Sequence, residues 1–390
     1  MTAYALYLHI PFCRQRCSYC DFNTYTTLGE LQDAYVVALA REIRQVGALA
    51  ADEPAGTPAI RTIFFGGGTP SLLTTAQLEH ILTAARETFA VAGDAEITLE
   101  ANPGTVSLDY LAALRSLGVN RLSYGVQSAL PGELALLGRA HDFAAAVEAA
   151  RLARAAGFDN LNLDLIYGLP GQSVDDWRRT LDAVLPLGVE HVSLYCLTIE
   201  PGTPMQRWLH NGTIQPPDPD TAADQYEAAG AALAGAGFEH YEISNWARPG
   251  RACRHNVVYW RNEPYLGLGA GAHGLGGGYR YQVVRQPRAY VRRMAGSPVG
   301  PFPLSAAVAA YHPVGRVEAM SDTAITQLRL LQEGLDLGAF AGRFGQTFDE
   351  VYGDTVRQLE NWDLLRRDDG HLLLTERGRF LSNQVFYRFV

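Results

Sequence analysis

The sequence lacks several features that mark common classes of protein. It contains no lysine, so all 32 basic residues are arginine, a bias that genome composition explains better than function does. No apolar run reaches the roughly 18 residues that a membrane-spanning helix requires. A net charge of −9 creates no overall positive field that would attract nucleic acid. These absences predict a globular protein with no transmembrane segment and no nucleic-acid partner.

The first residues, MTAYALYLHI, lack a basic leader and a small-residue cleavage site, so we expect a β-strand here and not a signal peptide. The expected location is therefore the cytoplasm, and any contact with the inner membrane would be peripheral and made through partners. Five cysteines are an awkward number for a disulfide framework. In a reducing compartment, clustered cysteines favour metal or redox chemistry instead.

Residues 1–245 alternate short apolar segments, which predict strands, with amphipathic segments, which predict helices. The expected strands are YALYLHI, IRTIFF, AEITLE, NRLSYGV, NLNLDLIYG and HVSLYCLT. The helical patterns between them include LQDAYVVALAREIRQV, TAQLEHILTAARETF and VDDWRRTLDAVLPLG. Six alternations joined by right-handed crossovers predict an α/β fold, a partial (β/α)6 barrel of the TIM type. An open doubly wound sheet is the alternative arrangement.

The pattern changes after residue 210. A helix, TAADQYEAAGAALAGAG, and a single strand, HYEISNWA, are expected to complete the first domain. Residues 246–300 form a connecting region with an aromatic-rich segment and then a glycine-rich one, GLGAGAHGLGGG. These glycines have no strand–turn–helix context, so they predict tightly packed backbone and not a dinucleotide site. Residues 301–390 begin in a linker and include the hairpin signal LLRRDDGHLLLT, so we expect a small winged-helix-like domain that packs or docks a partner.

Three cysteines lie within eight residues, in the segment CRQRCSYC: Cys13, Cys17 and Cys20. The spacings CxxxC and CxxC allow three thiolates to converge on one metal centre. Zinc sites usually have four ligands, often in two separated pairs, and the other two cysteines stand alone in the sequence. A zinc site closed by His9 is the alternative. A [4Fe–4S] cube normally takes four thiolates, so three would leave one iron open to a reactive ligand.

Polar residues or glycines also mark the carboxyl ends of the predicted strands. The segment FFGGGTPS follows the second strand, and its glycines would let a ligand approach the backbone closely. Barrels of alternating strands and helices place their ligand sites at this rim. The polar side chains in or at the ends of the next four strands are Glu100, Gln127, Asp164 and Thr198.

The cysteine motif after the first strand resembles that of the radical S-adenosylmethionine (SAM) superfamily. Over nearly the whole length, the chain is similar to the HemN/HemW group of that superfamily through the segments YLHIPFC, FFGGGTPS, EANPG, NRLSYGVQS, LGRAH and DLIYGLPGQ. The resemblance implies a [4Fe–4S] cluster on three cysteines with SAM on the open iron, where an electron from the cluster cleaves SAM to a 5′-deoxyadenosyl radical. HemN-like members are oxygen-independent coproporphyrinogen III dehydrogenases, whereas HemW-like members are regarded as heme chaperones.

The resemblance also implies the residues that bind SAM. Positions that contact the cluster-bound SAM correspond to Tyr7, Gly67 and Glu100. Positions that line a second SAM in HemN correspond to Tyr19, Gly68, Thr69, Gln127, Arg139, Asp164 and Thr198. In these roles Glu100 would pair with the SAM ammonium or sulfonium, Asp164 with ribose hydroxyls or an ammonium, and Arg139 with a carboxylate.

Three departures from HemN favour the HemW branch. Phe22 stands where HemN has a further cysteine, the first strand begins near residue 4 without HemN's N-terminal extension, and His255-Asn256-x-x-Tyr259-Trp260 is the HNxxYW motif typical of HemW. Neutral imidazole is an axial heme ligand and aromatic groups pack on macrocycles, so the resemblance implies heme ligation by His255. A core histidine with two packing aromatics is the alternative. Cys253 is a weaker candidate for a heme contact, and His273 either belongs to the SAM site or satisfies backbone groups.

The resemblance thus implies a heme chaperone that binds a [4Fe–4S] cluster, SAM and heme. Its expected partners are heme-accepting proteins such as respiratory cytochromes, and a cluster-dependent homodimer is a further expectation for this family. The alternative is a coproporphyrinogen III dehydrogenase or another radical SAM oxidase that acts on a tetrapyrrole. A zinc-dependent binding protein is a remote third possibility. No residue is assigned a catalytic role.

Overall fold

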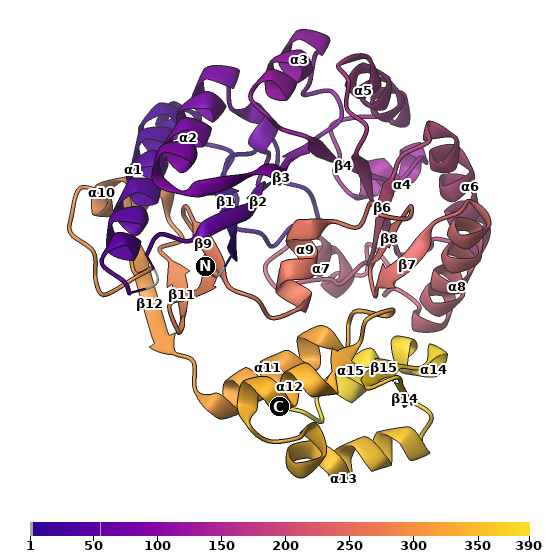
Figure 1. Ribbon diagram of the computed structural model, residues 1–390. Coiled ribbons are helices and arrows are strands. Elements are labelled where there is room, and N and C mark those ends of the chain that lie inside the picture. Colours follow the sequence, from indigo (N-terminus) through magenta and orange to yellow (C-terminus); the bar gives the residue numbers. More distant parts are fainter. Residues whose placement is uncertain (1–2, 55) are drawn as a thin grey trace.

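The computed structural model describes residues 3–54 and 56–390 (Figure 1). Within them, one large sheet has the strand order β12-β11-β10-β9-β1-β2-β3-β4-β5-β6-β8-β7. Six consecutive strands pair in parallel: β1 (Ala3–Ile10), β2 (Ala59–Gly67), β3 (Ala90–Ala101), β4 (Arg121–Gln127), β5 (Leu161–Tyr167) and β6 (His191–Cys196). Their spatial order follows the sequence without the reversal that a doubly wound sheet requires. The predicted partial (β/α)6 barrel is therefore confirmed.

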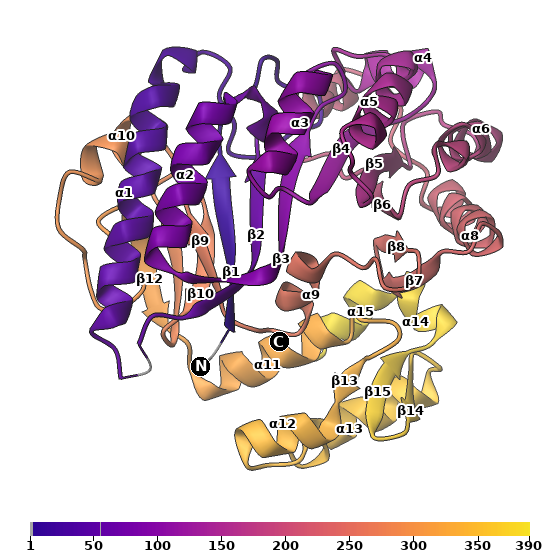
Figure 2. The same ribbon diagram turned by 45° about the horizontal axis from the view of Figure 1, so that its top comes forward.

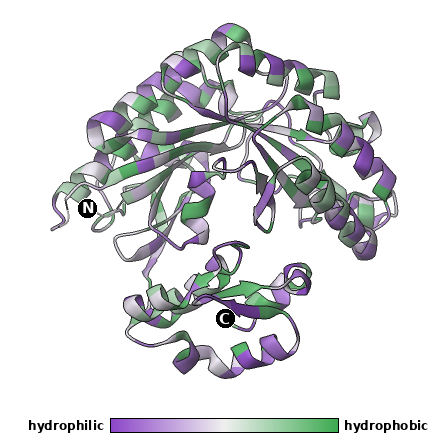
Figure 3. Ribbon diagram, turned by 45° about the vertical axis from the view of Figure 1, so that its right-hand side comes forward, coloured by the Kyte–Doolittle hydropathy of each residue, from purple (hydrophilic) through white to green (hydrophobic). Residues whose placement is uncertain are grey.

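Helices cover the outer face of these strands (Figure 1). Several begin where the sequence supplies a cap, because Thr74, Ser107, Asp142 and Ser173 each accept a hydrogen bond from the backbone N–H three residues later. In Figure 3, hydrophobic colour runs along the buried strands, while the helices alternate hydrophobic and hydrophilic residues. The helices are α1 (Gln32–Ala51), α2 (Thr75–Thr88), α3 (Leu108–Ser116), α4 (Pro131–Leu136), α5 (Phe143–Ala155), α6 (Val174–Val184), α7 (Pro204–His210) and α8 (Pro219–Gly235).

The sheet continues beyond β1, which makes β1 an interior strand. On this side β9 pairs with β1 in parallel, and three antiparallel strands follow: β9 (Tyr265–Leu268), β10 (His273–Gly276), β11 (Tyr279–Val283) and β12 (Val308–Pro313). Close packing here depends on glycine, because a Cβ on Gly267 would collide with the carbonyl oxygen of His273. Two helices flank this extension, α9 (Arg254–Trp260) and α10 (Pro287–Arg293).

The segment HYEISNWA forms two strands and not the single strand that we predicted. β7 (Glu239–Glu242) and β8 (Asn245–Ala247) make an antiparallel hairpin at the far edge of the sheet. Glu242 faces Asn245 in the register, so Ile243 and Ser244 are the turn. Alternation of apolar and polar residues has the same period in one long strand and in two short ones, which is why the pattern did not show the break.

The C-terminal part forms its own hydrophobic core around Phe340, Phe348 and Val356. A three-stranded sheet in the order β13-β15-β14 packs with helices, and the predicted hairpin is present as β14 and β15. The boundary predicted at residue 301 precedes β12, which belongs to the large sheet, and the helices of the second core begin at Arg316. The elements are α11 (Arg316–Gln327), β13 (Leu335–Asp336), α12 (Leu337–Phe344), α13 (Phe348–Asn361), β14 (Leu365–Asp368), β15 (His371–Leu374), α14 (Glu376–Phe380) and α15 (Ser382–Phe386).

The C-terminal domain lies beside α9 and the β7–β8 hairpin in both ribbon views (Figures 1 and 2). Polar contacts join the two parts. The Asn262 side chain donates to the Thr323 hydroxyl at 3.0 Å, and Arg261 pairs with Glu333 at 2.8 Å. Among residues 3–54 and 56–390, every helix is too short or too polar to cross a bilayer.

Candidate functional site

A cavity of about 500 Å³ lies inside the partial barrel. It extends from the loop after β1, past the inward-facing residues of the parallel strands, to α9. The structure brings into its lining every residue that the sequence assigned to the cluster, to SAM or to heme ligation: Tyr7, Cys13, Cys17, Tyr19, Cys20, Gly67, Gly68, Thr69, Glu100, Gln127, Arg139, Asp164, Thr198 and His255.

The cysteine-containing loop is held against the end of α4. The Ser18 backbone N–H donates to the Leu137 carbonyl at 3.1 Å, and the Ser18 hydroxyl donates to the Leu136 carbonyl at 2.6 Å. The side-chain amide of Gln15 donates to the Gly138 carbonyl at 2.9 Å. These contacts fix the backbone of the loop, so its three thiols are presented to the cavity from a defined position.

Two of the three thiols have polar neighbours, while burial raises the pKa of Cys13 and of Cys20. The Thr69 hydroxyl donates to Cys13 Sγ at 3.5 Å, and Arg139 Nη1 donates to Cys17 Sγ at 3.3 Å. Across the described part of the chain, no three His, Cys, Asp or Glu side chains lie close enough to hold a single metal ion. In an iron–sulfur cube each thiolate binds a different iron, so the sulfurs need not meet at one point. The donor set therefore fits a cluster better than a mononuclear zinc site.

His9 is not available to close a zinc site in this structure. It is buried, and Nε2 donates to the Asn23 carbonyl at 3.1 Å while Nδ1 accepts from the Tyr7 hydroxyl at 3.0 Å. Burial lowers the pKa of His9 to about 4, which keeps the ring neutral. His9 instead supports Tyr7 and the loop that follows the cysteines.

The glycine segment at the end of β2 lies between the chain that follows β1 and Glu100 on the neighbouring strand β3. The Gly68 N–H donates to the Ile10 carbonyl at 2.8 Å, and a Cβ on Gly68 would lie 2.6 Å from the Phe12 carbonyl oxygen. Gly67 has a φ of +108°, and its N–H donates to Glu100 Oε2 at 3.1 Å. Only glycine allows this backbone to sit against the strand and point an N–H into the cavity.

Two carboxyl groups line the barrel interior, Glu100 on β3 and Asp164 on β5. Burial and the charge of Asp164 raise the pKa of Glu100 to about 8, and burial also raises the pKa of Asp164. Asp164 accepts hydrogen bonds from Asn162 Nδ2 at 2.8 Å and from the Ser123 hydroxyl at 3.0 Å. Both groups would ionise more readily beside a cation, so the cavity suits a ligand with a positively charged group, as SAM has.

We predict that Glu100→Gln stabilises the cluster-free, ligand-free protein in a pH-dependent way. The unfolded chain loses the Glu100 proton near pH 4.5 and the folded chain near pH 8, so this group costs the wild type stability as the pH rises between these values. Glutamine has no proton to lose. The excess in unfolding free energy of Glu100→Gln over wild type should therefore grow from about pH 5 to about pH 8, measured by denaturant unfolding at each pH.

Glu79→Gln is the matched control, because Glu79 is exposed on α2. Its difference from wild type should stay small and flat with pH. A Glu100→Gln difference that is equally flat would show that the carboxyl ionises normally in the folded protein.

His255 in α9 is fully enclosed. Its Nδ1 is hydrogen-bonded with the Thr62 hydroxyl at 2.8 Å and its Nε2 with the Tyr259 hydroxyl at 2.8 Å. The ring stacks on Phe64 with centroids 5.0 Å apart, and burial lowers the pKa of His255 to about 3. The imidazole is therefore neutral, as a heme ligand must be, but Nε2 can reach an iron only after Tyr259 moves away.

Cys253 and His273 lie outside the cavity that the three cysteines face. Cys253 is completely buried, with Sγ donating to Glu96 Oε1 at 3.6 Å, and burial raises its pKa to about 12. It is not among the residues that line this cavity or its neighbour. His273 lines the neighbouring cavity. The structure therefore does not bring the Cys253 thiol to the proposed ligands.

Glu96 is a residue that the sequence reasoning missed. Its carboxylate accepts the backbone N–H groups of Arg254 at 3.1 Å and His255 at 3.0 Å, at the start of α9. Cys253, at the N-cap position, makes no side-chain cap, so β3 supplies the cap instead. Alternation along AEITLE places Glu96 on the same face as Glu100, which is the signal that would have identified it.

Other cavity residues follow the same alternation. Residues two apart on a strand share a face, so each predicted site residue has neighbours that point the same way. The missed residues that this rule identifies are Ser123 and Gly125 on β4 and Asn162 and Ile166 on β5. Ser193 and Tyr195 on β6 also line the cavity, but steps of two residues from Thr198, which lies beyond β6, do not reach them.

The chain is similar to known protein families, to curated relatives and to a solved structure. Residues 7–184 match the model of the radical SAM superfamily, and residues 316–381 match that of the HemN C-terminal domain. The heme chaperone HemW of Mycobacterium tuberculosis is 40% identical over 98% of this chain and 93% of its own length, and that of Bacillus subtilis is 34% identical over 98% of both. The solved structure of Escherichia coli coproporphyrinogen III oxidase, HemN, a radical SAM enzyme, is 26% identical with a TM-score of 0.84, covering 100% of this chain and 90% of that chain.

Proposed function

Because this chain belongs to the radical SAM superfamily and, within it, to the HemW heme chaperone family, we propose that it binds heme beside an iron–sulfur cluster and SAM and delivers the heme to an acceptor protein. One observation carries the proposal. A single cavity contains both the three-cysteine loop and His255 of the HNxxYW helix, which are more than two hundred residues apart in the sequence.

The residues around the cavity fit the groups that a radical SAM domain implies. Cys13, Cys17 and Cys20 would hold a [4Fe–4S] cluster, which when bound supplies the electron for SAM cleavage. The Gly67 N–H and the Glu100 carboxylate meet on one wall and would hold the charged amino-acid part of SAM. The remaining polar residues would hold further parts of SAM or a second SAM: Tyr7, Tyr19, Gly68, Thr69, Gln127, Arg139, Asp164 and Thr198.

Heme ligation by His255 requires a local rearrangement. Nε2 exchanges the Tyr259 hydroxyl for the heme iron, while Thr62 keeps Nδ1 and thereby orients the ring. The acceptors are heme proteins such as respiratory cytochromes. In this proposal the protein acts in the cytoplasm, reaches the inner membrane only through its partners and forms a homodimer when the cluster is present.

Heme titration tests the ligand. Wild-type protein should bind heme with a shift of the heme absorption band, and His255→Ala should weaken binding by at least about tenfold through loss of the iron–imidazole bond. Tyr259→Phe removes the competing hydrogen bond but keeps the ring, so it should bind heme at least as tightly as wild type. An unchanged affinity and spectrum in His255→Ala would exclude this histidine as the ligand.

The structural match to HemN over the whole chain keeps a second candidate, a coproporphyrinogen III dehydrogenase. The two candidates differ in what happens to a porphyrin precursor. Incubation of the reduced, cluster-loaded protein with SAM and coproporphyrinogen III should leave the substrate unchanged if the protein is a chaperone. Formation of protoporphyrinogen would establish the enzyme instead. Transfer of bound heme to an apo-cytochrome is the matching positive assay for the chaperone.

A further inference from the structure

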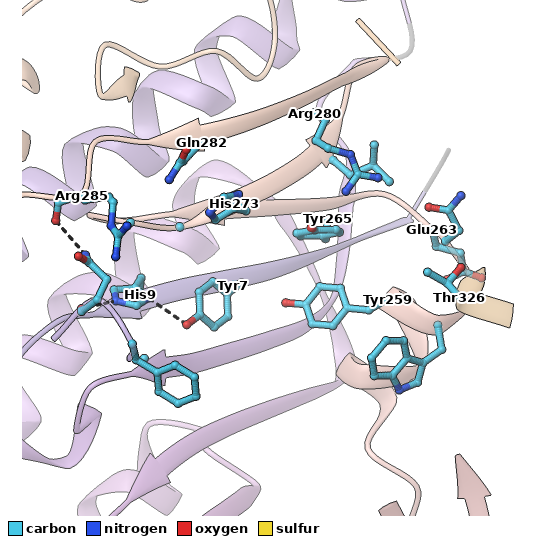
Figure 4. A pocket seen from close by; sticks show the side chains of 18 of the residues that line it. Tyr7, His9, Tyr259, Glu263, Tyr265, His273, Arg280, Gln282, Arg285 and Thr326 are labelled. Atoms are coloured by element: carbon cyan, nitrogen blue, oxygen red, sulfur yellow. Dashed lines mark hydrogen bonds between the residues drawn. The ribbon is translucent and has the colours of Figure 1, made fainter. Parts of the chain in front are cut away.

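A second cavity, of about 660 Å³, lies between the antiparallel extension of the sheet and α9 (Figure 4). Its volume is in the roughly 300–1,000 Å³ range of pockets for large organic ligands. It adjoins the cluster cavity, because five residues line both: Tyr7, Phe22, Gly67, Glu100 and Tyr259. A ligand here would lie next to the proposed SAM and heme-ligating residues.

The lining of this second cavity contains aromatic rings, two arginines and the carboxyl groups of Glu100 and Glu263, the second of which pairs with Arg61. Tyr259 and Tyr265 meet edge to face, with ring centroids 4.6 Å apart, and Tyr7 lies beside them. Arg280 and Arg285 come from the β10–β11 side (Figure 4). Tyrosine rings pack on flat apolar ligands, and guanidinium groups bind carboxylates through two parallel hydrogen bonds. The cavity therefore suits a planar ligand that carries carboxylate groups.

The two arginines differ in whether their charge is already matched. Arg280 pairs with Asp322 at 2.5 Å and approaches Glu318 at 3.5 Å, so it links the sheet to α11. Arg285, by contrast, has no carboxylate within 4.0 Å among the residues that the structure describes. Its guanidinium is thus the charge in this cavity that is open to a ligand.

The backbone of Arg285 is nevertheless firmly placed. Its carbonyl accepts hydrogen bonds from Asn23 Nδ2 at 2.8 Å and from the Tyr25 hydroxyl at 3.3 Å. Both donors follow the cysteine loop in sequence. Figure 4 shows Arg285 on the side of His9 and Tyr7, with Tyr259 beyond Tyr7. If a carboxylate of a ligand binds Arg285, the rest of the ligand therefore lies against the tyrosines and extends towards α9.

We propose that Arg285 anchors a carboxylate of the ligand in this second cavity, and that the ligand is a planar tetrapyrrole. This inference rests on the proposed function, under which the ligand is heme, Arg285 binds a heme propionate, and the macrocycle lies against Tyr7, Tyr259 and Tyr265. The propionate anchor then holds one edge of the macrocycle in the second cavity, and the macrocycle meets His255, which lines the cluster cavity, at the shared wall that Tyr259 forms.

The test compares heme with heme dimethyl ester, whose propionates are blocked, on the full-length, cluster-loaded protein. Wild type should bind heme about tenfold more tightly than the ester, because a charged hydrogen bond between guanidinium and carboxylate is lost on esterification. Arg285→Gln should weaken heme binding about tenfold and leave ester binding unchanged. Arg285→Lys keeps the charge but cannot form two parallel hydrogen bonds to a carboxylate. Its affinity for heme should therefore lie between those of wild type and Arg285→Gln.

Arg288→Gln is the matched control, because it makes the same change of charge on neighbouring α10. Arg288 is exposed, pairs with Glu30 at 2.5 Å and does not line the cavity. The Arg288→Gln variant should bind heme and heme dimethyl ester with the same affinities as wild type. Equal melting temperatures for Arg285→Gln and Arg288→Gln would show that loss of affinity is not loss of fold.

The outcomes separate this inference from the proposed function. If wild type binds heme but Arg285→Gln and wild type have equal affinities, Arg285 is not the anchor and the heme-binding function stands. If wild type discriminates against the ester but Arg285→Gln does so equally, another cation binds the propionates and the assignment to Arg285 is again wrong. If wild type binds neither ligand, the proposed function itself fails, and this inference with it.

Discussion

Cys17→Ala is expected to abolish iron binding and the brown colour that an iron–sulfur cluster gives to anaerobically purified protein. The three cysteine thiols all face one cavity. No group of three histidine, cysteine or carboxylate side chains in the described part of the chain surrounds a single metal ion, so no alternative metal site competes with the cysteine loop. With two thiolates left, a cube would lack ligands on two irons. Iron and sulfide analysis together with the visible spectrum measures the effect.

Cys196→Ala controls for the general loss of a thiol. Cys196 ends β6, is exposed and lines the same cavity, but it is not part of the cysteine loop. It should retain full iron content and colour. Wild-type protein that is colourless and loaded with zinc would overturn the cluster assignment, and so would Cys17→Ala protein with undiminished iron.

The second large effect is expected for Glu96→Ala. This buried carboxylate accepts two N–H groups at the start of α9, and its charge also lies near the buried guanidinium of Arg121. Its removal leaves two buried donors without partners and takes a negative charge from a helix N-terminus. We expect a loss of about 3–5 kcal/mol in unfolding free energy, together with faster hydrogen exchange of the α9 amides.

Two variants sharpen this experiment. Asp94→Ala removes an exposed partner of Arg254 on the same strand, 3.4 Å away, and should cost less than about 1 kcal/mol. Glu96→Gln keeps one acceptor oxygen but loses the charge. Its loss of unfolding free energy should therefore lie between those of Glu96→Ala and Asp94→Ala. If Glu96→Ala and Asp94→Ala had similar small effects, Glu96 would not be what holds α9 in place.

The sequence predicted the barrel because its strands and helices have strong local signals. The six parallel strands are short apolar runs, and helices begin at residues such as Ser107 and Asp142 that cap them locally. The extension from β9 to β12 was not predicted. Its strands are short and rich in glycine, and the packing that makes glycine necessary at Gly267 comes from another strand. Because the need for glycine arises from a contact with a different strand, it produces no periodic pattern in the local sequence that could predict these strands.

The candidate site likewise includes residues that the sequence identified and features that the sequence could not reveal. The cysteine spacing and the motifs were sufficient to identify residues that prove to line one cavity. The surroundings of His255 were not predictable, because its partner Thr62 lies 193 residues away and nothing in HNxxYW shows that both ring nitrogens are already bonded. The Arg285 guanidinium could not be recognised as available either, since its availability depends on where every carboxylate of the chain comes to rest.

The interior position of β1 has a consequence for the order of events during synthesis. Asn23, which follows the cysteine loop, donates a hydrogen bond to the Arg285 carbonyl, and Arg285 is synthesised 262 residues after it. At about 5–20 residues per second, roughly 13–50 s separate the two. During that interval β1 lacks its neighbour β9, and the loop lacks the contacts that close this side of it. We therefore expect that a truncated nascent chain that ends before β9 does not retain the proposed cluster, which iron analysis of the truncated chain would measure.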